Sequence, residues 1–325
     1  MRRNILFTAT FHSSFIDQDL QILQRAFNVT PVISRGLTAF SSFADHLAST
    51  DVTFSWFASV YSSCLVILTT LLGKKSVLVL GGVDVAAEKE LNYGIWNTWW
   101  KSKIVRYGIT HASEVLAVDD FLRREAIRLA QYDGGNISVV PTGYEHEYWI
   151  PSQIKENIVL TVASCPDLAR AKLKGIDVFI SVARKIPDVR FQIIGIDPVV
   201  ASTLSPPRNL ECLPFSDRET LRSSYQRAKV YCQLSYREGL PNALCEAMLC
   251  ECIPIGTDVG GIPTAVGDTG YLVEYHNEGQ TIRAIRDALT LSSERGKLAR
   301  KRIASHFSIE QREVALKRII DELLL

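Results

Sequence analysis

The sequence predicts an α/β protein of two domains, each built on a parallel sheet that helices cover on both faces. Three observations support this fold class. The chain has 325 residues, which suits two domains of about 150 residues each. Apolar residues make up 47% of it, an ordinary globular proportion that excludes a disordered or collagen-like chain. Short β-branched apolar runs without polar alternation recur between helical patterns, as expected for strands buried on both faces.

These apolar runs predict the strands of both halves in order. The expected strands of the first half are residues 5–9, 29–33, 52–57, 77–80, 114–118 and 137–140. Those of the second half are residues 158–163, 190–194, 210–213, 230–234, 253–257 and 270–273. Ligands of such sheets bind beyond the carboxyl ends of the strands.

The strand pattern restarts after Pro141-Thr142-Gly143, where turn residues and a polar stretch intervene. We therefore expect Rossmann-like domains at residues 1–148 and 149–308. Residues 309–325 form an amphipathic pattern, which predicts a helix that packs back on the first domain. Its expected apolar face consists of Val314, Leu316, Ile319, Ile320, Leu323 and Leu324.

Charge and cysteine usage exclude several classes of protein. Lys and Arg total 36 against 35 for Asp and Glu, so the net charge of +1 gives no general attraction to nucleic acid. The seven cysteines are scattered through apolar stretches, which is typical of reduced thiols in a cytoplasmic protein. Cys250 and Cys252 have no second Cys or His pair at ligand spacing nearby, so no zinc site is expected.

Two segments imitate membrane signals. Arg2 and Arg3 precede the apolar residues 5–11, but no small-residue cleavage pattern follows, so a first buried strand is favoured over a signal peptide. Residues 52–73 contain no charge, yet they divide into a strand at 52–57 and a helix at 59–72. A strand and a helix therefore explain them better than a membrane span does.

The most informative stretch, residues 235–248, follows the strand at 230–234 and leads into a helix at 241–249. Pro241 suits the start of that helix, where its missing N–H has no partner to lose. With the helix dipole, the backbone N–H groups at this helix end form an anion site suited to a diphosphate.

Glu238 and Glu246 are eight residues apart in this stretch. A carboxylate accepts two hydroxyl hydrogen bonds at once, which suits the vicinal diols of a ribose or hexose. As an alternative, Glu238 only stabilises the helix end and Glu246 is a solvated surface charge. The apolar neighbours of Glu246 favour a functional role, because an idle carboxylate is costly to bury.

The ordered series of motifs resembles the retaining glycosyltransferases of family four, the glycosyl transferases group 1, whose fold is GT-B. Glu238-x7-Glu246 is similar to the Glu-x7-Glu signature of that family. The resemblance extends over about residues 137–325, through Val140-Pro141-Thr142-Gly143, Lys174-Gly175-Ile176-Asp177, Cys252-Ile253-Pro254-Ile255, Gly260-Gly261-Ile262-Pro263 and residues 267–273. The first domain matches only in layout. The resemblance implies two Rossmann-like domains whose parallel sheets face an interdomain cleft.

The resemblance also implies roles for matching residues. Glu246 would bind the ribose hydroxyls of the nucleotide, and Glu238 would hold the donor sugar beside the reaction centre. Lys174 would neutralise the diphosphate as the nucleotide leaves. The stretch Gly239-Leu240-Pro241-Asn242 would bind the donor, with the backbone N–H groups of Leu240 and Asn242 directed at the phosphates. Leu213 would contact the base, although a strand-end Leu also fits ordinary core packing.

One departure from the family concerns a phosphate-binding cation. The family usually has an Arg just after the first strand of the second domain, where this chain has Ser164. Arg170 or Lys172, in the longer loop before Lys174, can substitute, or both are solvated loop charges. A second departure is Thr264, where the family commonly has an acidic residue.

The first domain is expected to hold the acceptor. Gly82 and Asp84 follow the fourth strand, and Asp84 is a candidate catalytic residue that binds the sugar or assists the acceptor hydroxyl. An Asx-turn or cap role for Asp84 is equally open. Ser13 and Ser14, after the first strand, are candidates for contact with phosphate or acceptor, although small polar residues there often only turn the chain.

An aromatic and basic cluster lies in residues 96–106. This composition suits an interfacial membrane contact or an acceptor platform, but we favour a helix with its aromatics in the core. Residues 1–150 carry 13 positive and 14 negative charges, so no broad attraction to anionic lipid is expected. The cluster consists of Trp96, Trp99, Trp100, Lys101, Lys103 and Arg106.

The expected function is transfer of a sugar from a nucleotide-diphosphate donor to a hydroxyl of a saccharide, lipid or other acceptor. The resemblance implies a retaining, hexosyltransferase-type enzyme. We expect no metal, since no acidic pair flanks a strand end, and no other cofactor. We also expect no nucleic-acid partner and a cytoplasmic location, with a peripheral membrane contact left open.

The alternatives are a non-catalytic nucleotide-sugar-binding or regulatory protein, which the missing phosphate Arg favours, and a nucleotide-sugar epimerase. A phosphorylase would need a lysine for a pyridoxal cofactor, and nothing marks one. A dehydrogenase is disfavoured because no Gly-x-Gly-x-x-Gly follows the first strand.

Overall fold

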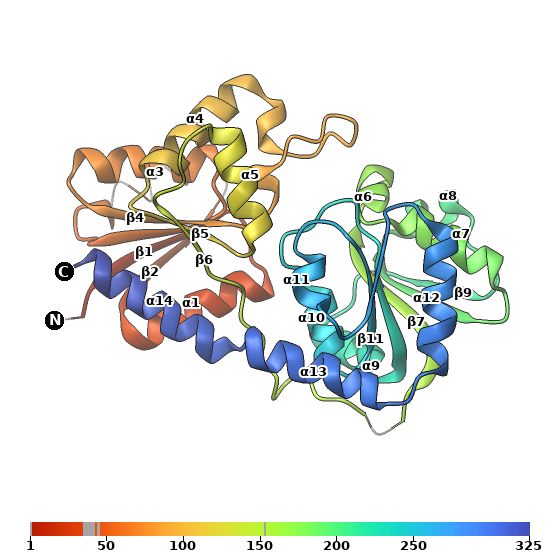
Figure 1. The fold of residues 1–325 in the computed structure, drawn as a ribbon. Coiled ribbons are helices and arrows are strands. Elements are labelled where there is room, and N and C mark those ends of the chain that lie inside the picture. Colours follow the sequence, from red (N-terminus) through yellow and green to blue (C-terminus); the bar gives the residue numbers. More distant parts are fainter. Residues whose placement is uncertain (1, 35–42, 44–45, 153) are drawn as a thin grey trace. The chain divides into compact units, whose positions relative to one another are not determined.

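The computed structural model describes residues 2–34, 43, 46–152 and 154–325. The chain divides into two compact units. Unit 1 comprises Met1–Gly143 and Ile309–Leu325, and unit 2 comprises Tyr144–Ser308. Each unit contains a six-stranded sheet, and the paired strands of both sheets run parallel in the described residues (Figure 1). The α/β class with two parallel sheets, predicted from the sequence, is confirmed.

All expected strands are present, with ends within two residues of the predicted ones. Buried parallel strands are continuous apolar runs, and such runs are visible in a single sequence. The strands of unit 1 are β1 (Asn4–Ala9), β2 (Asn28–Ile33), β3 (Val52–Trp56), β4 (Lys75–Leu80), β5 (Glu114–Ala117) and β6 (Ile137–Val139). Those of unit 2 are β7 (Glu156–Cys165), β8 (Arg190–Ile196), β9 (Leu210–Leu213), β10 (Ala228–Gln233), β11 (Ile253–Thr257) and β12 (Tyr271–Val273).

The sheet of unit 1 has the order β2-β1-β3-β4-β5-β6. Helices lie on both of its faces in Figure 1, with α3 and α4 on one and α1 and α14 on the other. The helices of unit 1 are α1 (Ser14–Ala26), α3 (Val60–Leu71), α4 (Trp99–His111), α5 (Asp120–Ala130) and α14 (Ile309–Leu323), with the 3-10 turns η1 (Val83–Val85) and η2 (Ile95–Asn97).

Residues 52–73, the uncharged segment, form β3 and most of α3. Ser59 caps α3 by accepting the N–H of Ser62, whose hydroxyl accepts the N–H of Ser59 in return. In the described part of the chain, no helix has the length and apolar character needed to cross a bilayer.

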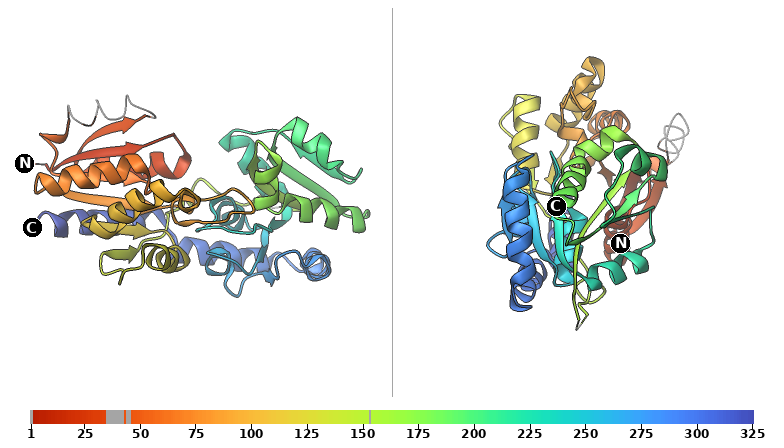
Figure 2. Two further views of the ribbon diagram at one scale, coloured as in Figure 1. Left: turned by 90° about the horizontal axis from the view of Figure 1, so that it is seen from above. Right: turned by 90° about the vertical axis from the view of Figure 1, so that its right-hand side faces the viewer.

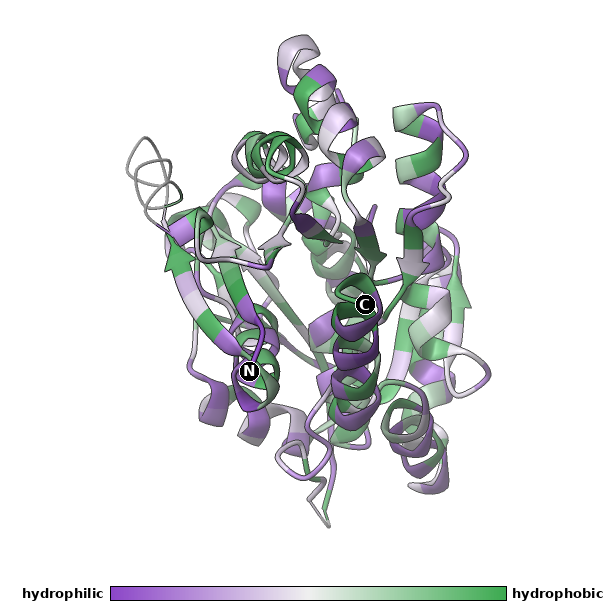
Figure 3. Ribbon diagram, turned by 90° about the vertical axis from the view of Figure 1, so that its left-hand side faces the viewer, coloured by the Kyte–Doolittle hydropathy of each residue, from purple (hydrophilic) through white to green (hydrophobic). Residues whose placement is uncertain are grey.

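Helix α14 packs on α1 in unit 1. Leu316, Ile319 and Ile320 are buried, but Val314 is 67% exposed, so including it in the apolar face was wrong. Both hydrophobic and hydrophilic residues follow one another along this helix (Figure 3). The two chain ends lie side by side in unit 1, where the Arg3 guanidinium donates to the Leu324 carbonyl at 3.1 Å (Figures 1 and 2).

The sheet of unit 2 has the order β12-β11-β10-β7-β8-β9. A buried apolar cluster joins α7 and α12 to the strands, and it includes an edge-to-face contact of Phe179 with Phe191, whose ring centroids are 5.3 Å apart. The helices of unit 2 are α6 (Leu168–Leu173), α7 (Ile176–Lys185), α8 (Pro198–Leu204), α9 (Arg218–Arg227), α10 (Asn242–Leu249), α11 (Ile262–Val266), α12 (Glu278–Thr290) and α13 (Glu294–His306).

Candidate active site

The candidate site lies where the strand order of unit 2 reverses. The chain adds β8 and β9 on one side of β7, and then returns to pair β10 with the other side of β7. The segments that follow β7 and β10 therefore leave neighbouring strands at the same carboxyl edge. Ligands of parallel sheets bind at such a reversal, because the two segments diverge and leave a crevice.

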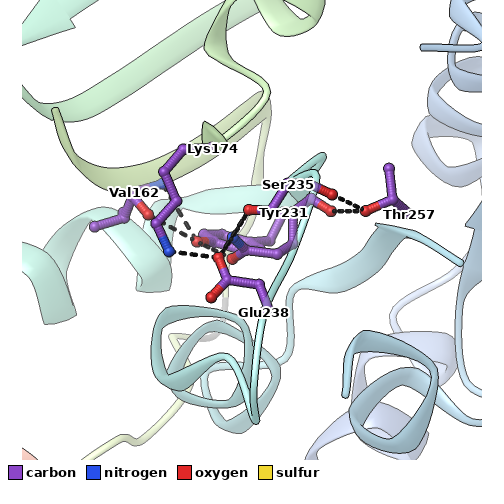
Figure 4. Close-up of polar contacts among 7 residues, drawn as sticks. Val162, Lys174, Tyr231, Ser235, Glu238 and Thr257 are labelled. Atoms are coloured by element: carbon purple, nitrogen blue, oxygen red, sulfur yellow. Dashed lines mark hydrogen bonds and ion pairs between the residues drawn. The ribbon is translucent and has the colours of Figure 1, made fainter. Parts of the chain in front are cut away.

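Lys174 and Glu238 meet at this edge (Figure 4). The Lys174 ammonium donates to Oε1 of Glu238 at 2.5 Å. The Ser235 hydroxyl donates to the same oxygen at 2.8 Å, and the Gln233 amide at 3.1 Å. No described residue donates to Oε2 of Glu238. The carboxylate is thus held rigidly through one oxygen, and the other can accept a hydrogen bond from a ligand.

A buried hydrogen-bond chain supports this carboxylate from behind (Figure 4). The Gln233 amide donates to the Ser235 hydroxyl at 2.8 Å, and the Tyr231 hydroxyl donates to Oε1 of Gln233 at 3.2 Å. Thr257 of β11 donates to the Ser235 carbonyl at 2.7 Å. Burial raises the pKa of the Tyr231 hydroxyl well above its ordinary value, so it stays protonated as a donor.

The sequence patterns did not predict roles for Gln233, Ser235 or Tyr231. The signal that could have found them is a Gln among the apolar residues of the predicted strand 230–234. A buried amide is costly unless it is hydrogen-bonded, so Gln233 in β10 implies polar partners nearby.

Two glycines permit the close approach of the backbone segments. Gly175, with φ +68°, follows Lys174, and a Cβ on it would lie 2.0 Å from the carbonyl oxygen of Leu234 at the end of β10. Gly260, with φ +58°, lies against Glu238, whose carbonyl oxygen would be 2.1 Å from a Cβ there. Glycine at these positions lets the Lys174 segment and the 258–261 loop contact the β10 segment directly.

Helix α10 begins beside Glu238. Pro241 is its N-cap, with φ −78° and ψ 106°, so the helix starts at Asn242 and our placement of Pro241 inside it was one residue early. Gly239 and Leu240 are buried in the turn that leads to it. The Tyr144 hydroxyl donates to the Asn242 side chain at 2.8 Å and anchors the first turn. An α-helix leaves its first N–H groups without intrahelical partners, and these favour an anion.

Glu246 lies about one turn along α10, which begins at Asn242, and is partly buried. Burial raises the pKa of its carboxyl from 4.5 to about 7, and the positive charge of Arg218 and a 3.3 Å hydrogen bond from the Tyr225 hydroxyl oppose this rise. Arg218 itself forms an ion pair with Glu145 and lies over the Tyr148 ring, 4.0 Å from its centroid. Glu246 is therefore a shielded carboxylate and not a freely solvated charge.

The segment between β7 and Lys174 is not a loop, as we expected, but the short helix α6. Asp167 caps it by accepting the Arg170 N–H at 2.7 Å. Ser164 is exposed, as is Lys172. Arg170 is partly buried and lies one turn before Lys174, whose N–H donates to the Arg170 carbonyl at 3.0 Å.

Cys165 has a buried thiol at the carboxyl end of β7. Burial raises the pKa of Cys165 to about 11, and the positive charges of Lys174 and then Arg170 oppose that rise. Both cations therefore act on the carboxyl end of β7. Leu213, at the end of β9, is partly buried and pairs with Ile194 of β8.

In unit 1, Asp84 is fully buried in a turn at the carboxyl end of β4. Its carboxylate accepts the backbone N–H of Gly82 at 2.7 Å, of Gly81 at 3.1 Å and of Ala58 at 3.1 Å. Burial raises the pKa of Asp84, and these backbone hydrogen bonds oppose the rise. This geometry is that of a carboxylate that stabilises a turn and ties the β3 and β4 ends together.

The two serines after β1 differ in their surroundings. Ser14 is the first residue of α1 and is exposed. Ser13 is the N-cap of α1, and its hydroxyl is buried without a hydrogen-bond partner among the described residues. Of the two, Ser13 has the unsatisfied polar atom that a ligand can bind.

The aromatic cluster of residues 96–106 departs from the arrangement we favoured. Trp96 is partly buried and donates its indole N–H to the Asp84 carbonyl at 2.8 Å. Trp99 and Trp100, however, lie on the surface of α4 and are 72% and 43% exposed. Placing these two rings in the core was wrong, because Val105, Gly108 and Ile109 form the buried face of this helix.

A cavity of about 490 Å³ in unit 2 is separate from this site. Its lining includes the ends of β7, β10 and β11 opposite the carboxyl edge, with three lysines. Lys155 donates to the Cys250 carbonyl, Lys229 to the Leu289 carbonyl, and Lys297 to Glu294. Protein acceptors thus hold these cations. Among the described residues, no group of three Cys, His, Asp or Glu is placed to hold a metal ion.

Comparison with known proteins supports the sequence resemblance. Residues 152–304, nearly all of unit 2, match the family described as glycosyl transferases group 1. D-inositol 3-phosphate glycosyltransferase of Mycobacterium sp. (strain KMS) is 26% identical over 208 residues, which cover 56% of this chain and 46% of the relative. The chain therefore spans about half the length of that curated relative.

Solved structures with low sequence identity share the fold over the whole chain. Sucrose-phosphate synthase of Thermosynechococcus elongatus superposes with a TM-score of 0.83 at 15% identity and covers 99% of both chains. HepE of Anabaena, in complex with UDP-glucose, gives a TM-score of 0.78 at 12% identity over 98% of this chain and 99% of its own. The predicted GT-B fold is thereby confirmed.

Proposed function

Because residues 152–304 belong to the glycosyl transferases group 1 family and the chain has the GT-B fold, we propose that this protein transfers a sugar from a nucleotide-diphosphate donor to an acceptor hydroxyl. One observation carries the proposal. Glu238 is fixed through Oε1 by Lys174, Ser235 and Gln233, and Oε2 stays open beside the first turn of α10. A preorganised carboxylate next to a cation and a helix N-terminus suits a sugar bonded to a diphosphate.

In the proposed reaction, the bond from the anomeric carbon to the phosphate oxygen breaks as the acceptor oxygen bonds to the same carbon. The acceptor proton passes to an oxygen of the leaving phosphate, so no separate protein base is required. Oε2 of Glu238 accepts a hydroxyl of the donor sugar and orients it. Glu246 binds the ribose hydroxyls. We propose retention of configuration on the basis of the family resemblance.

The charges at the site require a second cation. Glu238 compensates Lys174, so the pair is neutral and a diphosphate with at least two negative charges needs further positive charge. Arg170 is one helical turn from Lys174 on α6 and acts on the same strand end, whereas Lys172 is exposed. We assign Arg170 the role of the phosphate-binding Arg that is replaced by Ser164.

These groups provide the charge stabilisation that a divalent cation supplies in other transferases. We therefore propose that turnover needs no metal. In unit 1, we propose that the acceptor hydroxyl binds near Ser13 and the Gly81-Gly82 turn. Asp84 holds that turn, and its carboxylate is already occupied by backbone donors.

The test is turnover by the purified full chain with a panel of UDP-, GDP- and ADP-sugars, starting with UDP-glucose, the ligand in the HepE structure. Binding is detected by thermal shift, since a ligand at 100 times its Kd stabilises the fold by about 2.7 kcal/mol. Release of nucleoside diphosphate, unaffected by EDTA and lost in Glu238→Ala, supports the proposal. NMR of the product anomer tests retention.

Two other outcomes would replace this function. A donor that binds but never turns over with any acceptor indicates a nucleotide-sugar-binding or regulatory protein. Conversion of the donor to a different nucleotide-sugar, without release of nucleoside diphosphate, indicates an epimerase. Neither alternative has a specific structural observation in its favour. The missing phosphate Arg favoured a binding protein, and our proposal gives that role to Arg170.

A further inference from the structure

Helix α4 of unit 1, whose place in the fold is labelled in Figure 1, carries exposed indole rings and cations. Trp99 and Trp100 begin the helix and are 72% and 43% exposed. Lys103 and Arg106 follow Trp99 by one and two turns, and both are exposed. The helix buries its opposite side, so these four side chains share its outer face.

The cations and rings of α4 are in contact. The Lys103 ammonium lies 5.2 Å from the centroid of the Trp99 ring, and the Lys101 ammonium lies 5.6 Å from that of Trp100. Such cation–π contacts keep positive charge beside the indole faces. No acidic residue occurs in Trp99–His111, so the helix carries a formal charge of +3 with His neutral.

Helices α3 and α5 pack against α4. Helix α3 contains no charged residue. Helix α5 carries Asp120 and Glu125, and these form ion pairs with arginines of α5 itself. Unit 1 contains 16 Lys and Arg against 16 Asp and Glu, a formal net charge of 0, so any attraction of anions by unit 1 is local to this face and not general. An exposed pair of Trp rings flanked by Lys and Arg, without acidic neighbours on the helix, matches the chemistry of the headgroup region of an anionic bilayer.

We propose that unit 1 docks on an anionic lipid surface through α4, with Trp99 and Trp100 at headgroup level and Lys103 and Arg106 beside the lipid phosphates. The chain passes from the Gly81–Asp84 turn through η1 and η2 into α4. The first turn of α4 therefore lies at the same edge of the unit 1 sheet as that turn. The docking does not depend on the proposed sugar transfer.

The experiment is flotation of the full chain with vesicles of phosphatidylcholine and phosphatidylglycerol at 3:1, and with phosphatidylcholine alone. We expect binding to the anionic vesicles that weakens at high salt, and little binding to the neutral ones. Each cation near an anionic surface strengthens binding about fivefold. Lys103→Gln/Arg106→Gln should therefore lower the partition coefficient about 25-fold, and Trp99→Ser/Trp100→Ser at least tenfold.

Val314→Ser/Lys317→Gln is the matched control, because it removes an exposed apolar side chain and a cation from another helix of unit 1. It should bind vesicles as the wild-type chain does. Thermal unfolding confirms that each variant is folded. The proposal is overturned if the wild-type chain does not float with anionic vesicles, or if the α4 variants float as well as the control.

Two results would assign the face to another occupant and also overturn the proposal. A dimer in solution that only the Trp99→Ser/Trp100→Ser variant dissociates would identify a second copy of the chain. Loss of saccharide binding in that variant, without any change in flotation, would identify an acceptor platform. Failure of sugar transfer leaves the flotation result standing, so the two proposals fail separately.

Discussion

Arg312 of α14 and Asp19 of α1 form a buried, two-pronged ion pair across 293 residues of sequence, with N–O distances of 2.9 and 2.6 Å. The Arg312 guanidinium also donates to the carbonyls of Val140 and Pro141 and lies 5.7 Å from the centroid of the Trp56 ring, and Trp56 donates its indole N–H to Asp19 at 2.9 Å. The last helix, the first helix and the end of the β6 segment are thus joined at one point.

We expect Asp19→Asn to lower the free energy of unfolding by about 3–5 kcal/mol, because it leaves the buried Arg312 charge uncompensated. The control is Arg25→Gln, which breaks an exposed ion pair with Glu313 between the same two helices and should cost less than about 1 kcal/mol. Urea unfolding measures both. Equal losses in the two variants would contradict a special role for the buried pair.

We expect Glu238→Gln to reduce kcat for sugar transfer about 100- to 1000-fold without a loss of thermal stability, because the carboxylate orients the donor sugar. Ser235→Ala removes only one of the three donors to Oε1 and should reduce kcat about tenfold. Steady-state kinetics with the identified donor measure both. If Glu238→Gln retained full activity, the carboxylate would have no part in the reaction.

We expect Arg170→Ala to weaken binding of a nucleoside diphosphate about 10- to 100-fold, since a charged hydrogen-bond donor is lost. Lys172→Ala is the matched control, because it removes an exposed cation two residues away and should change the Kd less than about twofold. Isothermal titration calorimetry at two salt concentrations provides the measurement. The reverse ranking of the two variants would assign the phosphate to Lys172.

Glu246 makes stability depend on pH. Its pKa is about 7 in the folded chain against an ordinary 4.5, so between these values the unfolded chain releases a proton that the folded chain keeps. Stability therefore falls as pH rises from about 4.5 to 7, by at most about 3 kcal/mol. Glu246→Gln should lack this contribution. Chemical unfolding of both chains at pH 5 and pH 8 tests it, and parallel profiles would refute it.

The titration of the Glu246 carboxyl also predicts how nucleotide binding depends on pH. The ionised carboxylate accepts two ribose hydroxyls, whereas the protonated form loses acceptor capacity. Affinity for a nucleoside diphosphate should therefore increase as pH rises through about 7 in the wild-type chain. Calorimetric titrations at pH 6 and pH 8 should show a smaller step in Glu246→Gln, and an equal step would place the titrating group elsewhere.

We expect Gly175→Ala to destabilise unit 2 by about 1–3 kcal/mol and to reduce transfer, because the methyl group meets the Leu234 carbonyl and φ is +68°. Gly279→Ala, in the first turn of α12, has only ordinary contacts and should be neutral or slightly stabilising. Differential scanning calorimetry compares them. A Gly175→Ala chain as stable and active as wild type would show that the close approach of Lys174 to β10 is not required.

The sequence by itself determined the strands, the two-sheet class and the resemblance of the second half to a known family. Parallel strands buried on both faces are continuous apolar runs, which are visible in the sequence. Glu238 and Glu246 are close in sequence, so their motif can be recognised without knowledge of tertiary contacts. The exposure of Trp99 and Trp100 was not predictable in this way. Aromatic composition does not say which side of a helix meets the sheet.

Only the tertiary structure decided which hydrogen-bond and ion-pair partners each polar side chain has. Asp84 was a candidate catalytic residue in the sequence, but the amides of Ala58, Gly81 and Gly82 surround its carboxylate. Arg170 and Lys172 were indistinguishable until α6 placed Arg170 one turn from Lys174. Hydrogen bonds and charge interactions depend on distances across strands and turns, and these follow from chain packing that no local sequence pattern encodes.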